Sequence, residues 1–218
     1  MAALPADSRA LIESNAREAI DLVGELTLLL DRVGNNCAEL AAARMVTRRI
    51  ADRLGQAMTL ERLERRGGVR PDAFSPLEIL EELEHEAVSL AASRIDVKVC
   101  PPELVPQCWY FDRELVSMSL SNALHNALTH ANQAVTLELR LTNGCLGFSV
   151  ADDAGAFPAE LMADDPSALA RGEINGNALG IHFARLAAQA HVNRGIRGWV
   201  ELTNLSHTPG TRFTLWLP

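Results

Sequence analysis

Two asparagines, Asn122 and Asn126, lie four residues apart in the otherwise largely apolar stretch Leu115–Ala131. The apolar residues recur at helical spacing, so this stretch is predicted to form a buried helix. Residues four positions apart share one face of a helix, which aligns Asn122, Asn126 and His130 along a single stripe. Because a buried amide group is costly unless it is hydrogen-bonded, this stripe needs polar partners. Those partners are either neighbouring loops of the protein itself or a bound polar ligand.

The N-terminal part of the chain is predicted to form a helical hairpin that dimerises. Apolar residues recur at helical spacing over residues 7–33 and again to about residue 64, with the turn residues Gly34-Asn35-Asn36 between them. Cations followed by glycines at Arg65–Gly68 end the second helix. Two helices of this length expose more apolar surface than one hairpin covers. A four-helix bundle built by two chains is therefore expected, with residues 7–66 forming the homodimer.

The predicted domains are residues 1–68, for this hairpin, and residues 69–218, which combine helices with a mixed β-sheet. The fold class is α+β. After a linker at Val69–Phe74, the capping box Ser75-Pro76-Leu77-Glu78 opens a helix that runs to about Ser93. Alternating apolar residues on both sides of Asn143-Gly144 predict a β-hairpin. Helices are expected on one face of the sheet. The remaining predicted elements are a strand at Ile95–Cys100, a helix at Leu179–His191, and a final hairpin from Gly198–Leu205 and Thr211–Leu217.

Four segments in order resemble the ATP-binding domain of the histidine-kinase, gyrase and heat-shock-chaperone ATPase superfamily. They read NALHNALTH (Asn122–His130, the asparagine box), DDAGAFP (Asp152–Pro158, the first glycine box), GNALGI (Gly176–Ile181, the second glycine box) and GTRFTLWLP (Gly210–Pro218). The likeness is greatest to sensor histidine kinases and covers roughly residues 74–218. It implies a Bergerat-type α/β sandwich. Histidine kinases also dimerise through a helical hairpin placed just before this domain.

The resemblance implies roles for individual residues. Asn126 would hold the magnesium ion that bridges the nucleotide phosphates, with Asn122 nearby on the same face. Asp152 would accept a hydrogen bond from the adenine amino group, and His130 stands where the family has an aromatic residue that stacks on adenine. The expected ATP- and magnesium-binding set is completed by residues of the second glycine box and of the closing strand, namely Gly176, Leu179, Gly180 and Thr211.

The chain also departs from the family pattern. Ala154, Ala156 and Ala178 stand where the family has glycines, and Thr129 replaces a lysine that meets the phosphates. Alanine in such a loop costs roughly 1 kcal/mol of strain where left-handed backbone is needed, or its methyl group fills space where the backbone approaches the ligand. Three such changes are expected to weaken the binding of ATP and magnesium, or to abolish it. The site is therefore predicted to be degenerate.

A histidine kinase places its phosphoacceptor histidine on the first helix of the hairpin, yet the first histidine of this sequence is His85. Phosphoryl transfer to histidine needs that imidazole nitrogen. His85 and His125 are interpreted as packed or surface residues of the second domain. No confident catalytic residue follows from the sequence.

Composition limits the possible partners. A formal net charge of −8 and a pI near 5.3 argue against non-specific nucleic-acid binding. No apolar run approaches 18 residues, so no membrane span is expected, and four cysteines without C-x-x-C pairing suit a cytoplasmic protein.

Three functional hypotheses remain. The first is a pseudokinase of two-component signalling that lacks autophosphorylation and acts by binding a response regulator or a sensor kinase. The second is an ATP-dependent protein kinase that phosphorylates a partner in trans. The third, a phosphotransfer protein of the two-helix bundle type, requires a histidine on the hairpin and is ranked last.

Overall fold

The computed structural model describes residues 68–91, 95–100, 105–162, 177–205 and 209–218, with a few isolated positions between residues 18 and 59. Apart from those positions, the predicted hairpin of residues 7–66 and its dimer lie outside the described residues. The chain divides into two compact units, and the sheet belongs to the one that comprises Gly68–Asp165 and Gly180–Pro218. No helix in the described ranges has both the length and the apolar character needed to cross a membrane.

A five-stranded mixed sheet forms the centre of this unit, with strand order β2-β4-β5-β9-β8. Strand β2 runs parallel to β4, and the other neighbours are antiparallel, which confirms the predicted mixed sheet. Asn143 and Gly144 both have positive φ, 52° and 75°, as a two-residue type I′ turn requires. The strands are β2 (Asp96–Cys100), β4 (Ala134–Thr142), β5 (Cys145–Asp152), β8 (Trp199–Asn204) and β9 (Thr211–Leu217).

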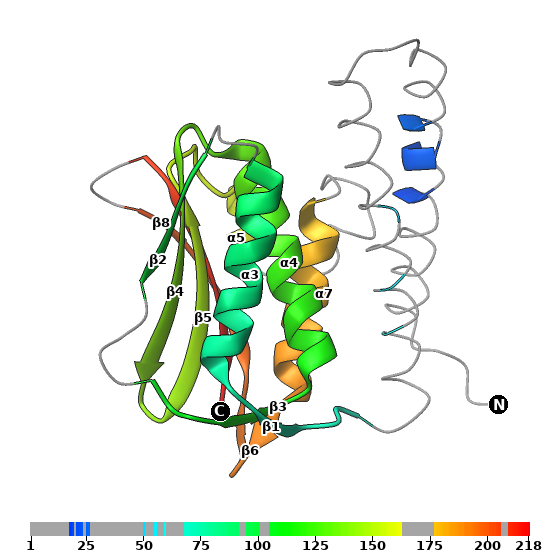
Figure 1. Cartoon of the computed structure of the whole chain (residues 1–218). Coiled ribbons are helices and arrows are strands. Elements are labelled where there is room, and N and C mark those ends of the chain that lie inside the picture. The colour runs from blue at the N-terminus through cyan, green and yellow to red at the C-terminus, as the bar shows by residue number, and fades with distance from the viewer. Residues whose placement is uncertain are drawn as a thin grey trace, which may run out of the picture. The chain divides into compact units, whose positions relative to one another are not determined.

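Helices α3 (Pro76–Ala91), α4 (Arg113–His130) and α7 (Asn177–Ala190) lie on one face of the sheet (Figure 1). The predicted start of the first of these is confirmed, because the Ser75 hydroxyl accepts a hydrogen bond from the Glu78 N–H at 3.4 Å. Asp112 caps α4 in the same way and accepts the Leu115 N–H at 3.2 Å. A fourth helix, α5 (Ala159–Met162), is a single turn.

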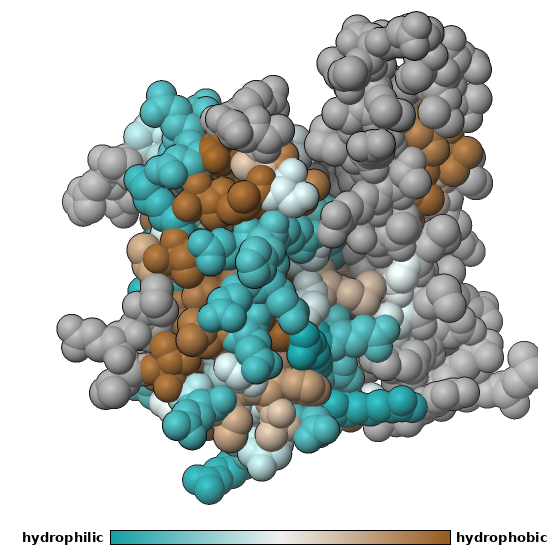
Figure 2. Space-filling view, in the orientation of Figure 1, coloured by the Kyte–Doolittle hydropathy of each residue, from teal (hydrophilic) through white to brown (hydrophobic). Residues whose placement is uncertain are grey.

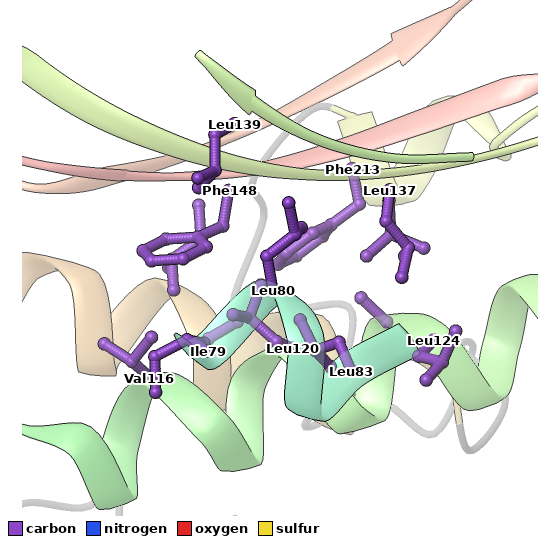
Figure 3. Packing of buried hydrophobic residues seen from close by; sticks show 14 of the residues in the cluster. Ile79, Leu80, Leu83, Val116, Leu120, Leu124, Leu137, Leu139, Phe148 and Phe213 are labelled. Carbon is purple, nitrogen blue, oxygen red and sulfur yellow. The ribbon is translucent and has the colours of Figure 1, made fainter. Parts of the chain in front are cut away.

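The hydrophobic core lies between these helices and the sheet (Figure 3). Every second residue of β4 points to the helices, as expected for a strand with one covered face. Figure 2 shows a hydrophilic band where Figure 1 places α3. The exposed residues of this helix include Glu78, Glu81 and Glu82. The core residues labelled in Figure 3 are Ile79, Leu80, Leu83, Val116, Leu120, Leu124, Leu137, Leu139, Phe148 and Phe213.

Two features differ from the prediction. The predicted linker Val69–Phe74 contains a strand, β1 (Asp72–Phe74), which pairs with β3 (Trp109–Phe111). The pairing is favoured by aromatic packing, since the ring centroids of Phe74 and Phe111 lie 5.5 Å apart. The second feature is a small unpredicted hairpin, β6 (Val192–Asn193) and β7 (Ile196–Arg197), whose turn holds Arg194 at φ 50° before a glycine.

Candidate functional site

The candidate site begins at the end of the sheet where β5 finishes and β9 starts. Asp152, the last residue of β5, pairs with Val135 of β4 on one side and with Thr211 of β9 on the other. The Thr211 hydroxyl donates a hydrogen bond of 2.5 Å to Asp152 Oδ2, and the Ala154 N–H donates one of 2.9 Å to Oδ1. The carboxylate is half-buried and fixed on both oxygens. The structure thus brings two of the predicted site residues into direct contact.

Gly210 makes the contact between Asp152 and Thr211 possible. Its φ is +153°, and a Cβ at this position would lie closer than 3.0 Å to the Asp152 backbone oxygen. The Gly210 carbonyl also accepts the Leu205 N–H at 2.9 Å, which closes the loop between β8 and β9. Only glycine combines this φ with such a close approach of two backbones.

Residues 153–158, called the glycine-box loop below, leave the sheet directly after Asp152. Gly155 has φ +50°, whereas Ala154 and Ala156 do not have positive φ. Ala178 lies in the first turn of α7 and is helical. The left-handed strain predicted for these three alanines is therefore absent from the structure, because the one residue that needs left-handed backbone is still a glycine. The other part of the prediction, that the alanine methyl groups fill space beside a nucleotide, stays a prediction.

Asp153 ties the start of this loop to the end of α4. Its carboxylate accepts hydrogen bonds from the backbone N–H groups of Asn132 and Gln133, at distances between 2.8 and 3.2 Å. Partial burial opposes ionisation, but backbone hydrogen bonds from Asn132, Ala134 and Gln133 outweigh it and lower the pKa of Asp153. This residue was not among those predicted from the sequence, although it is the second aspartate of the first glycine box.

The asparagine stripe lies on one flank of α4. Asn122 and Asn126 are both half-buried, the Nδ2 atom of Asn122 is fully buried, and His130 is exposed at the end of the helix. A different flank faces α3, since Ser121 and His125 contact Glu86 at 2.9 and 3.1 Å. An α-helix turns by about 100° per residue, so the asparagines lie roughly a quarter turn away from that contact. The stripe predicted from spacing is thus present as a surface of α4 distinct from its contact with α3.

Helix α7 contributes the second glycine box. Leu179 and Gly180 are buried in its first turn, and Gly176 lies outside the described residues. Convergence of the asparagine stripe, Asp152 and the start of α7 on one nucleotide cleft therefore stays a prediction.

The other end of α7 is joined to α4 by a buried histidine that the sequence analysis did not single out. His191 Nε2 accepts the Asp112 N–H at 2.9 Å, and His191 Nδ1 donates to the Ala187 carbonyl at 2.7 Å. Burial lowers the pKa of His191, although the Ala187 carbonyl and the Asp112 charge act in the opposite direction. The Asp112 carboxylate also accepts the Arg70 N–H at 2.9 Å. These contacts fix the N-terminal end of the helix that carries the asparagines, whereas Asp153 binds the residues that follow its C-terminal end.

The chemistry of these groups fits the ligands that the resemblance implies. Each oxygen of the Asp152 carboxylate accepts one hydrogen bond and keeps a further lone pair, which suits a purine amino group. The carbonyl oxygen of Asn126 is the kind of ligand that magnesium accepts in small number from a protein.

Comparison with known proteins supports the superfamily. Residues 111–218 match the family described as histidine kinase-, DNA gyrase B-, and HSP90-like ATPase. This match begins at β3 and includes the asparagine stripe, Asp152 and the closing strand. The matched residues thus include most of the candidate site. No curated protein shows significant sequence similarity to the chain.

Several solved structures share the fold. The histidine kinase AdeS of Acinetobacter baumannii has a TM-score of 0.60 at 14% identity, covering 93% of this chain and 95% of that one. The catalytic domain of histidine kinase ThkA has a TM-score of 0.55 at 17% identity, covering 68% of this chain and 95% of that one. ThkA in complex with the response regulator protein TrrA has a TM-score of 0.63 at 13% identity, covering 93% of this chain and 59% of that one. Identities this low establish a common fold and nothing further.

Proposed function

We propose that the chain is a signalling protein of two-component type, whose histidine kinase-like domain does not autophosphorylate. It acts by binding a response regulator or a sensor kinase. The observation that carries this proposal is the combination of a histidine kinase-like domain with an N-terminal region that contains no histidine before His85. His85 is exposed on α3, inside the ATPase-like domain, and His125 is hydrogen-bonded to Glu86.

The class of partner is suggested by the likeness to ThkA, which is described in complex with a response regulator. Binding requires no phosphoacceptor, so a chain without that histidine retains this activity. The net negative charge of the chain makes a nucleic-acid partner unfavourable.

Incubation of the purified chain with magnesium and labelled ATP tests the proposal. We expect no stable label on the protein, while an active sensor histidine kinase treated identically becomes labelled. Titration of response regulators from the same genome into the chain should reveal at least one partner with micromolar affinity. Phosphohistidine detected on the chain would remove the proposal.

An ATP-dependent kinase acting in trans is the second candidate, and one observation favours it. The glycine-box loop accommodates its alanines without left-handed strain, and the Asp152 carboxylate is fixed in place. The replacement of glycines by alanines therefore reduces nucleotide affinity less in this geometry than it would if the alanines had left-handed backbone.

Calorimetric titration with Mg-ATP separates the two candidates. Micromolar affinity that is lost in Asp152→Asn, but kept in Asp96→Asn, favours the kinase. Asp96 is a suitable control because it is an exposed carboxylate on the edge strand β2. No measurable heat for the wild-type chain favours the binding protein, and labelled transfer to an added partner would establish the kinase.

A further inference from the structure

We infer that Asn204 is a positioning residue for the nucleotide site: it fixes the path of the glycine-box loop and the start of α5, and thereby sets nucleotide affinity. The affinity part of this inference rests on the second candidate function above, the ATP-dependent kinase that acts in trans. The positioning part rests on the structure of the loop alone.

Asn204 lies in the same row of paired residues as Asp152. Asn204 is the last residue of β8 and pairs with Thr211, which in turn pairs with Asp152. The three residues therefore form a row across β8, β9 and β5 at the same end of these strands. The glycine-box loop starts at the β5 end of this row, and Phe157 near its far end is bound to Asn204. The loop thus crosses β9 from β5 to β8.

The Asn204 side chain contacts both the glycine-box loop and α5. Its Oδ1 atom accepts the Phe157 N–H at 2.7 Å, and its Nδ2 atom donates to the Phe157 carbonyl at 3.4 Å. One side-chain amide thereby makes the pair of backbone hydrogen bonds that a residue of an antiparallel strand would make. The Nδ2 atom also lies 3.3 Å from the Met162 sulfur, at the end of α5. Aspartate cannot reproduce this set because it has no donor, and alanine has neither donor nor acceptor.

Two tethers, one at each end, hold the loop. Asp152 binds the Ala154 N–H at its start, and Asn204 binds the Phe157 N–H near its finish. Between them lies Gly155, the residue with left-handed backbone. Helix α5 is held additionally by Arg185, whose Nη2 donates to the Leu161 carbonyl at 2.7 Å. The two tethers thus give this loop a defined path although two of the family's glycines are alanines.

The test compares the wild-type chain with Asn204→Ala, Asn204→Asp and a matched control, Thr203→Ala. Thr203 is half-buried on the same strand, and its side chain points to the opposite side of β8. The measurements are hydrogen exchange at the Phe157 amide, the melting temperature, and the affinity for a fluorescent ATP analogue with magnesium. Because a net hydrogen bond corresponds to roughly a tenfold effect, we expect Asn204→Ala to lower Phe157 protection and nucleotide affinity by about tenfold each. Asn204→Asp should keep the protection of Phe157 and lose part of the affinity.

The outcomes separate the inference from the function on which it rests. Unchanged Phe157 protection in Asn204→Ala, or an equal loss in Thr203→Ala, overturns the positioning role. Reduced protection with unchanged nucleotide affinity overturns the link to affinity. If the wild-type chain binds no nucleotide, the nucleotide function fails and the link to affinity fails with it. The positioning role is then still decided by hydrogen exchange.

Discussion

Replacing Gly210 with alanine is expected to destabilise the domain strongly, because it violates two constraints at once. The φ of +153° belongs to a region that is essentially restricted to glycine, and occupying it costs about 1–3 kcal/mol. The new Cβ would also press against the Asp152 backbone oxygen, which belongs to a strand paired on both sides. Overpacking of this kind costs about 1–3 kcal/mol. Together these terms predict a loss of about 4 kcal/mol in the free energy of unfolding.

The matched control is Gly144→Ala. Gly144 has φ +75°, but a Cβ there would meet nothing within 4 Å, so this variant carries only the backbone strain of about 1–2 kcal/mol. Urea denaturation followed by circular dichroism measures both variants. For a domain of about 150 residues, each kcal/mol lowers the melting temperature by about 2–4 °C, so Gly210→Ala should melt about 8–16 °C below the wild type. Equal destabilisation of the two variants, within about 0.5 kcal/mol, would show that the close approach to Asp152 does not matter.

Three further predictions concern packing and pH. Gly147→Ala should lose about 2 kcal/mol of stability, because its Cβ would lie 2.7 Å from the Trp216 ring; the loss should shrink when Trp216→Leu is combined with it. Because the pKa of His191 is lowered in the folded state, the free energy of unfolding should fall as the pH drops below about 6.5, by at most about 1.4 kcal/mol per pH unit. His191→Gln should flatten this slope in unfolding curves recorded at several pH values. The lowered pKa of Asp153 contributes stability that is present above about pH 4 and is lost as the pH falls through the pKa of the folded state. Asp153→Asn should therefore make the free energy of unfolding less sensitive to acid. An unchanged dependence of that free energy on acidic pH would contradict this.

Elements whose sequence signal is local agreed with the structure. The capping box at Ser75 and the Asn143-Gly144 turn specify their own backbone geometry, and both are confirmed. The apolar spacing around Asn122 and Asn126 likewise predicted the helix α4 and the stripe on its flank. In each case the residues that carry the signal also make the structure, so no knowledge of distant contacts was needed.

What the sequence did not reveal depends on contacts between distant residues. Asn204 binds Phe157 across 47 positions, and His191 binds Asp112 across 79. An isolated asparagine or histidine carries no periodic signal, so its partner becomes visible only when the fold is known. The strand β1 was missed for the same reason, since three residues ordered by an aromatic partner look like a linker. The strain expected at Ala154 and Ala156 was wrong because the left-handed position in the loop is Gly155.

The carboxylate of Asp112 serves two parts of the backbone at once. One oxygen receives the N–H of Leu115 in the first turn of α4, and the other receives the N–H of Arg70, shortly after the sheet-bearing unit begins. A displacement of the chain at Arg70 would therefore move the same carboxylate that caps the helix carrying the asparagines. The path of the chain as it enters this unit is thus mechanically coupled to the integrity of that helix.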